Sequence, residues 1–210
     1  MKLYDFALAP NPRRVRMFLA EKGIEVPMVQ VNTRQREQFA DDFRALNPSC
    51  TVPVLQLDDG TCIAESVAIC RYFEETHPEP PLMGRDATDK GVVEMWNRRA
   101  EFDGILSVGD VLRNSAPMFE DRGLPGMPGG VPQIPALAER GRKAMDRFFR
   151  RLDERLGQSR FLAGDAFTIA DITAFVTIDF ARRADITIPD DCANVARWYA
   201  EIGARPSAAA

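Results

Sequence analysis

The sequence predicts an α/β domain at the N-terminus followed by an all-helical domain. Three observations lead to this fold class. Strand-like and helix-like segments alternate over residues 1–76, and a proline-rich stretch, THPEPPLMGRDATDK, follows them. Beyond that stretch the apolar residues recur at helical spacing, most regularly over residues 136–156. The expected organisation is a domain over residues 1–80, a linker over 81–88 and a helical bundle over 89–210.

The N-terminal elements follow from local patterns. They are a strand over residues 2–7, a helix over 12–23, a strand over 25–32, a helix or helical turn over 36–48, two antiparallel strands within 51–63 and a helix over 65–76. Gly23 is a helix-ending signal, and Asp59-Gly60 is a tight-turn pair between the two antiparallel strands. The order βαβ then αββα predicts a small thioredoxin-like α/β sandwich.

The helical half has a long helix near residues 86–114, then a loop over 115–135 with five prolines and four glycines, and a second long helix. Long loops of this kind are usually functional or mobile. In FLAGDAFTIADITAF, Thr168 and Asp171 have the spacing of a capping box, and Phe167 and Ile172 that of a hydrophobic staple. These four residues are predicted to start a helix.

Composition narrows the function classes. With 27 basic and 31 acidic residues the net charge is −4, which gives no electrostatic reason to expect nucleic acid or an anionic membrane as partner. The start of the chain lacks the pattern of a secretory signal, and no apolar run is long enough to span a membrane. The four cysteines have no C-x-x-C spacing and the single histidine cannot build a zinc site. We therefore expect a cytoplasmic protein with reduced thiols and no metal.

Three segments are predicted to form a binding site. In TVPVL, a cis bond between Val52 and Pro53 would leave the Val52 backbone free to pair with a peptide-like ligand. In AESVAI, the start of a helix and the Ser66 hydroxyl suit a carboxylate, and Glu65 suits an ammonium group. The start of the first helix, in APNPRRVR, is expected to face the reactive end of the same ligand. The three describe a pocket for a small zwitterionic peptide with a thiol; the alternative for Ser66 is a plain helix N-cap.

The chain resembles the glutathione transferases over nearly its whole length. The resemblance is carried by NPRRVRMFLAEKG, LNPSCTVPVLQLDDGTCIAESVAICRYFEETHPEPPLMG and RFLAGDAFTIADITAF, in order and spacing. It is greatest to a bacterial and fungal subgroup in which APNPRRVR is usual. The resemblance implies a glutathione-binding N-terminal domain, a C-terminal domain that shapes the acceptor pocket, a homodimer and a role in detoxification.

Residue by residue, the resemblance implies that Glu65 and Ser66 bind the γ-glutamyl group and that Val52 with cis Pro53 clamps the cysteinyl part. Gln38 falls where relatives place a polar or basic residue near the glycyl end. Glu101 or Asp103 is a candidate to reach the glutathione bound by the partner subunit, the alternative being a solvated helix position. Asn114 and Ser115, beside the long loop, are candidates for the acceptor site.

The usual catalytic group is missing. Ala9 stands where many relatives have a serine, Tyr4 is not at the tyrosine position, and Pro10 and Asn11 stand where other classes have a cysteine. Lowering a thiol pKa from about 8.5 by about two units takes roughly 2.7 kcal/mol, which a helix N-terminus and one charge-assisted hydrogen bond can supply.

We therefore expect the backbone of residues 11–13, the Asn11 amide and an ordered water to stabilise the thiolate. The alternative for Asn11 is a helix cap before Pro12 as first helical residue. Helical spacing predicts that two of Arg13, Arg14 and Arg16 face solvent.

The expected function is conjugation of glutathione to hydrophobic electrophiles. A glutathione-dependent peroxidase or disulfide reductase is an alternative suggested by Cys50, for which a structural role is favoured because it lies in the clamp loop. A non-catalytic ligand carrier or interaction protein of the same fold is the other alternative, suggested by Ala9. Retention of the Glu65, Ser66 and Val52 pattern favours continued glutathione binding in either case.

Overall fold

The computed structural model describes all of residues 1–210, and its N-terminal part is built on one four-stranded sheet. The strands are β1 (Lys2–Asp5), β2 (Met28–Gln30), β3 (Val54–Gln56) and β4 (Cys62–Ala64). Their order in the sheet is β2-β1-β3-β4. The pair β1–β2 is parallel and the other two pairs are antiparallel, as a βαβ unit followed by a hairpin requires.

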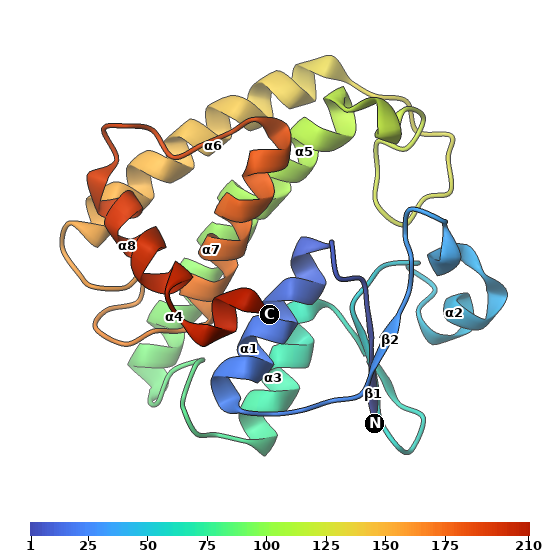
Figure 1. Cartoon of the computed structure of the whole chain (residues 1–210), viewed down its shortest axis with the longest axis horizontal. Helices are drawn as coiled ribbons and strands as arrows, with labels where there is room; N and C mark the ends of the chain where they lie inside the picture. Colours follow the sequence, from blue (N-terminus) through green and yellow to red (C-terminus); the bar gives the residue numbers. More distant parts are fainter.

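The N-terminal part also contains three helices and one 3-10 turn. They are α1 (Pro10–Lys22), the short 3-10 turn η1 (Glu37–Phe39), α2 (Asp41–Leu46) and α3 (Ser66–Thr76). Helix α1 ends at Gly23, whose φ of 65° is left-handed, as the sequence predicts. Figure 1 shows α1 and α3 side by side, between the strands and the C-terminal helices.

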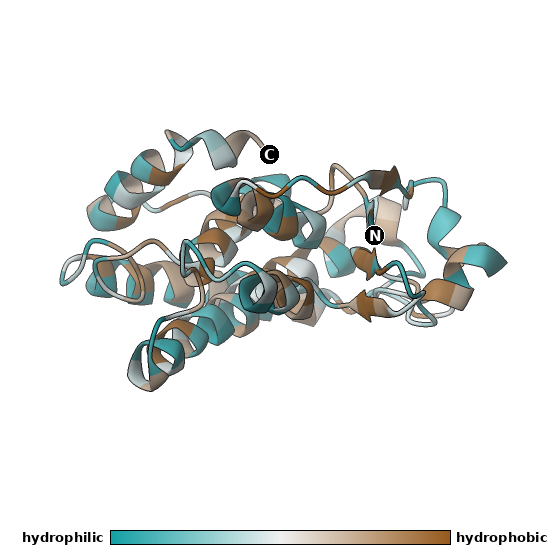
Figure 2. Ribbon diagram, turned by 90° about the horizontal axis from the view of Figure 1, so that it is seen from below, coloured by the Kyte–Doolittle hydropathy of each residue, from teal (hydrophilic) through white to brown (hydrophobic).

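The C-terminal part is entirely helical. Its elements are α4 (Ala87–Arg99), the π-helical segment η2 (Ala100–Ile105), α5 (Leu106–Ser115), η3 (Pro117–Phe119), α6 (Pro135–Leu156), α7 (Ile169–Ala181), η4 (Arg182–Ala184), α8 (Ala193–Gly203) and η5 (Pro206–Ala209). The long helix predicted near residues 86–114 therefore contains a π-helical segment in its middle. Figure 2 shows the hydrophobic faces of these helices turned towards one another. Helix α7 is buried on nearly all sides, which explains why it is apolar all round.

A single hydrophobic core joins the two parts. The larger cluster of buried side chains includes Phe18 of α1 and Phe73 of α3 together with Phe148 of α6 and Trp198 of α8. Leu82, in the proline-rich connection, is buried in the same cluster. The predicted fold class, a thioredoxin-like α/β domain with an all-α bundle, is confirmed, and the two parts pack as one body.

The predicted capping box lies at the start of α7 and is confirmed. The Asp171 carboxylate accepts hydrogen bonds from the Thr168 N–H at 3.0 Å and from the Thr168 hydroxyl at 3.1 Å. It also accepts from the Leu162 N–H and from Trp198 Nε1, each at 3.0 Å. Burial raises the pKa of Asp171 to about 6, although these donors act in the opposite direction. Asp171 thus connects the loop before α7 with α8.

Candidate functional site

The three predicted segments meet at one end of the sheet. The antiparallel register of β3 and β4 pairs Val54 with Ala64, so Val52, just before β3, and Ser66, just after β4, lie at the same end of this strand pair. The register of β1 and β3 pairs Tyr4 with Val54, so the end of β1 points the same way. The start of α1, the residue before Pro53 and the start of α3 therefore share this end.

Val52 offers an unused backbone edge to this end of the sheet. The bond from Val52 to Pro53 is cis, as predicted, and Pro53 is buried directly before β3. Neither the N–H nor the C=O of Val52 makes a hydrogen bond within the chain. An extended peptide can pair with such an edge through its own backbone.

The start of α3 carries polar groups that have no partner within the chain. Glu65 occupies the N-cap position with φ 70° and ψ 121°, a strained conformation for a residue other than glycine. Ser66 is therefore the first helical residue, and the alternative that it is a plain N-cap is wrong. Its side chain is buried, and its hydroxyl makes no hydrogen bond within the chain. The free N–H groups of the first turn and this hydroxyl converge on the same space.

Gln38 is the fourth predicted contact, and it is buried without a partner. It lies on η1 with 5% of its surface exposed, and its Oε1 accepts no hydrogen bond. A buried polar atom in this state costs about 1–3 kcal/mol. Next to it, the Arg36 guanidinium donates to the Pro128 carbonyl of the long loop, so η1 is also in contact with the C-terminal part.

The start of α1 differs from the prediction. The helix begins at Pro10 with Ala9 as the N-cap residue, so Asn11 lies inside the first turn and is not a cap. Pro10 and Pro12 have no N–H, and the Arg13 N–H bonds to the Ala9 carbonyl at 3.3 Å. Asn11 therefore supplies the one free backbone N–H of this turn. Of residues 11–13, which were expected to stabilise the thiolate through their backbone, only Asn11 has a free backbone N–H.

The prediction that two of the three arginines face solvent is wrong. Arg13 pairs with Asp179 of α7 and donates to the Ala208 carbonyl at 2.9 Å. Arg16 pairs with the buried Asp5 at 2.5 Å. Because α1 lies between the sheet and the helical half, all three arginines reach carboxylates of other elements, and helical spacing alone does not reveal this.

Arg14 is the most deeply buried of the three. Its Nη2 lies 2.6 Å from Glu101 Oε1, and its Nη1 donates to Asn11 Oδ1 at 3.3 Å. Glu101 is consequently not a solvated position, and Asp103 pairs with Arg151 in the same way. Both carboxylates that the sequence offered for contact with a partner subunit are engaged within their own chain.

The acceptor-site candidates anchor the long loop. The Asn114 side chain donates to the Asp110 carbonyl at 2.8 Å and accepts from the Ile134 N–H at 2.9 Å. The Ser115 hydroxyl donates to the Val111 carbonyl at 2.7 Å. The contact of Asn114 with Ile134 joins the two ends of the loop.

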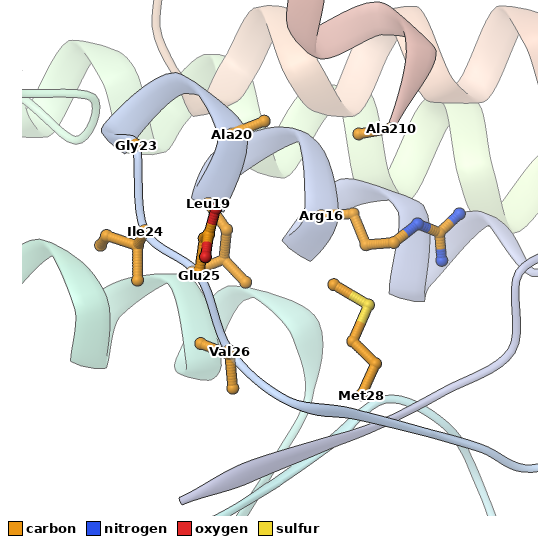
Figure 3. A pocket seen from close by; sticks show the side chains of 9 residues that line it. All are labelled: Arg16, Leu19, Ala20, Gly23, Ile24, Glu25, Val26, Met28 and Ala210. Atoms are coloured by element: carbon orange, nitrogen blue, oxygen red, sulfur yellow. The ribbon is translucent and has the colours of Figure 1, made fainter.

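Two surface cavities lie along α1. The smaller, of about 70 Å³, borders the start of the helix and is lined by Ala7, Leu8, Ala9, Pro10, Arg13, Val176, Asp179, Phe180 and Arg183. The larger, of about 600 Å³, is an open groove that contains none of the predicted site residues (Figure 3). The smaller cavity is not lined by a predicted site residue either, but it borders Ala9 and Pro10, directly before Asn11.

Three of the chain's four cysteines are buried, and Cys62 is half-buried. All four are free, and Cys50 is buried with its thiol directed to the Pro48 carbonyl at 3.6 Å. Burial raises the pKa of Cys70 to about 12, so its thiolate is scarce. No group of three or more His, Cys, Asp or Glu side chains is arranged to hold a metal ion. None of the helices combines the length and the apolar character needed to cross a membrane.

Comparison with known proteins decides the family. Residues 9–76 match the model of the glutathione S-transferase N-terminal domain, and residues 135–201 match that of the C-terminal domain. The chain is 34% identical to glutathione S-transferase 2 of Saccharomyces cerevisiae over 99% of its length and 87% of that protein. The chain belongs to the glutathione S-transferase family. Glutathione is the co-substrate of this family.

Two further relatives concern the fold and the range of reactions in the family. A glutathione S-transferase domain-containing protein of Marinobacter aquaeolei VT8 has the same structure, with a TM-score of 0.92, 38% identity and 99% of both chains covered. A maleylacetoacetate isomerase of Rattus norvegicus is 39% identical over 95 residues, 44% of each chain. The glutathione S-transferase family thus includes enzymes with different reactions, so membership of the family does not by itself determine the reaction of this chain.

The sequence analysis missed the contacts that cross between the two parts. The pairs of Arg14 with Glu101 and of Arg13 with Asp179 join residues 87 and 166 positions apart. The only available signal was the unusual density of arginine at the start of the first helix.

Proposed function

We propose that this glutathione S-transferase conjugates the glutathione thiolate to hydrophobic electrophiles in the cytoplasm. One observation carries the proposal: the buried Gln38 Oε1, the Ser66 hydroxyl and the Val52 backbone all lack a hydrogen-bond partner within the chain. Buried polar groups are normally paired, so this arrangement is expected of a ligand site.

The ligand contacts follow from the chemistry of each group. The N-terminus of α3 and the Ser66 hydroxyl would hold the γ-glutamyl carboxylate, and the exposed Glu65 carboxylate its ammonium group. The Val52 N–H and C=O, next to cis Pro53, would pair with the cysteinyl backbone. The Gln38 amide would bond the glycyl end. This set spans a tripeptide from end to end.

Asn11 is the proposed catalytic residue. Its backbone N–H is free at a helix N-terminus, and its side-chain Nδ2 has no partner within the chain. Both donors favour the thiolate over the thiol. The thiol loses its proton to solvent, and the thiolate sulfur then attacks an electrophilic carbon. A carbon–sulfur bond forms while the leaving group departs with its electron pair, or, in an addition, the electron pair moves onto the acceptor.

The acceptor is proposed to bind in the small cavity beside the start of α1. Leu8, Val176 and Phe180 supply apolar surface to this cavity beside the charged Arg13, Asp179 and Arg183, and Ala9 borders it where a larger residue would reduce the space. Asn114 and Ser115 remain candidates at the base of the loop, at the rim of the acceptor region. Apolar surface beside a thiolate suits hydrophobic electrophiles.

Two assays test the proposed function. The protein should be retained on immobilised glutathione and eluted by free glutathione, and it should conjugate glutathione to a chlorinated dinitrobenzene with release of chloride. Retention without conjugation of any of several aryl and alkyl halides would favour the non-catalytic alternative. Failure to bind glutathione would overturn the proposal.

Ser66→Ala is expected to weaken glutathione binding about tenfold or more. The variant removes one hydrogen bond to a charged carboxylate, worth about 1.5–3 kcal/mol. Isothermal titration calorimetry with glutathione measures the change. Ser159→Ala is the matched control, because the Ser159 hydroxyl donates to the Phe161 carbonyl at 2.7 Å in a loop remote in sequence from the site. Equal affinity of the two variants would contradict the assignment of Ser66.

The proposed partner is a second copy of the chain. Large apolar side chains project from the long helical run at Met95, Phe102 and Leu106, which are 40%, 60% and 55% exposed. Positions 95 and 102 lie two helical turns apart, and 102 and 106 about one turn apart. Exposed side chains of this size on neighbouring turns are typical of a surface that associates. A two-fold contact would pair the same face of each copy.

Phe102→Asp is expected to convert the dimer to a monomer. The charge would be placed in the centre of an apolar contact, where it lacks a partner. Analytical ultracentrifugation at micromolar concentration measures the mass. Leu124→Asp, at an equally exposed residue of the long loop, should leave the dimer intact. A monomeric wild type, or a dimeric Phe102→Asp protein, would show that this face is not the interface.

A further inference from the structure

The buried Arg14 guanidinium contacts Asn11 in the N-terminal part and Glu101 in the C-terminal part. Its side chain is 3% exposed and its partner Glu101 is 15% exposed. Glu101 lies on the π-helical segment between α4 and α5, and such segments are frequent at functional sites. A charge this deeply buried is tolerated only when it is paired, so Arg14 is held in one position by Glu101.

The remaining contact of Arg14 determines the orientation of the Asn11 amide. A guanidinium has donors and no acceptor, so the atom that faces it at 3.3 Å must be the amide oxygen of Asn11. The amide nitrogen, on the opposite side of the same planar group, is then directed away from Arg14. It has no partner in the chain.

We propose that Arg14, held by Glu101, is a positioning residue that turns the Asn11 amide so that its N–H bonds face the glutathione sulfur. This inference rests on the proposed function of the site. Arg14 does not touch the sulfur itself. Its effect is to remove the flipped state of the amide, in which an oxygen lone pair would face the thiolate and repel it.

Arg14 can be replaced without leaving Glu101 unpaired. Arg98 Nη1 also pairs with Glu101, at 2.6 Å from Oε2, so the carboxylate keeps a partner when Arg14 is replaced. Arg14→Met therefore removes the contact to Asn11 without leaving an unpaired buried charge. Arg14→Lys keeps a positive charge opposite Glu101 but replaces the two-pronged guanidinium by a single ammonium group, which cannot hold both partners in the same geometry.

The test is a pH titration of the thiolate absorbance of glutathione bound at saturation. Arg14→Met and Arg14→Lys are each expected to raise the pKa of the bound thiol by about one unit, which lowers the thiolate fraction about tenfold at any pH well below the wild-type pKa. Asn11→Ala should raise it as well, and adding Arg14→Met to Asn11→Ala should produce no further rise, because both changes act through the same amide. The lysine variant keeps the test informative if the methionine variant is unstable.

Arg16→Met is the matched control. Arg16 lies on the same helix and pairs with a buried carboxylate, Asp5, but does not contact Asn11. It should lower stability while the pKa of the bound thiol stays at the wild-type value. A wild-type pKa equal to that of free glutathione would overturn the proposed function and this inference with it. A lowered wild-type pKa that is unchanged in the Arg14 variants, or effects of the two residues that add in the double variant, would overturn the inference alone.

Discussion

Asn11→Ala is expected to lower kcat/KM for conjugation about tenfold to a hundredfold near pH 6.5. The variant loses the side-chain donor to the thiolate, and a hydrogen bond to a charged group is worth about 1.5–3 kcal/mol. KM for glutathione should change little, because Ser66, Val52 and Gln38 are proposed to bind the rest of the tripeptide. Steady-state kinetics with a chlorinated dinitrobenzene, at saturating acceptor, measures the effect.

The pH profile of Asn11→Ala distinguishes loss of thiolate from general damage. If the variant only raises the pKa of the bound thiol, its rate should approach that of the wild type once the pH exceeds the raised pKa. Asn11→Ser restores a donor and should recover part of the rate, whereas Asn11→Asp adds a negative charge and should lower it further. A bound thiol whose pKa is unchanged in Asn11→Ala would assign activation to the backbone N–H and water instead.

Asp171→Ala is expected to destabilise the protein by about 3–5 kcal/mol. The variant leaves buried donors of Leu162, Thr168 and Trp198 without an acceptor, each at a cost of about 1–3 kcal/mol that relaxation reduces. For a chain of this size the melting temperature should fall by about 10 °C or more, as calorimetry would measure. Asp165→Ala, at an exposed position of the same loop, should change stability by less than about 0.5 kcal/mol. Similar melting of the two variants would contradict a central role for the network.

The stability contribution of Asp171 is also expected to depend on pH. Its folded pKa of about 6 lies above the unfolded value of about 3.9, so the folded state binds the proton more tightly. The contribution is fully present below about pH 4 and is lost as the pH rises through 6. Relative to Asp171→Asn, which does not titrate, the wild type should therefore lose about 2–3 kcal/mol between pH 4 and pH 7.5. Urea unfolding at several pH values measures this difference.

An increase in the stability of the wild type with pH, relative to Asp171→Asn, would contradict a raised pKa of Asp171. If the advantage of the wild type over Asp171→Asn grew with pH, the four hydrogen-bond donors would stabilise the carboxylate by more than burial penalises it. The pKa of Asp171 would then be lowered, and the titration would shift to acid pH.

The sequence by itself determined the order of the N-terminal elements, the fold class and the family resemblance. These follow from short-range patterns: apolar periodicity, Gly23 at the end of α1, the hairpin turn at Asp59-Gly60, and the spacing of Thr168 and Asp171. The cis bond before Pro53 was expected from the same kind of local pattern. Such features depend on a few neighbouring residues, so they can be recognised before the chain is folded.

The tertiary structure alone decided how the start of α1 is organised. In the folded chain Asn11 lies inside the helix and has the one free backbone N–H of the first turn. Arg14 is buried and contacts both Asn11 and Glu101. Residues that meet across the packed domains are distant in the chain, and a charged residue at a helical position has the same local pattern whether it faces solvent or a buried carboxylate. Only the packing of α1 against the helical half shows which arginines are buried. A buried arginine needs a carboxylate partner, and the spacing of arginines along the helix does not show which residue that partner is.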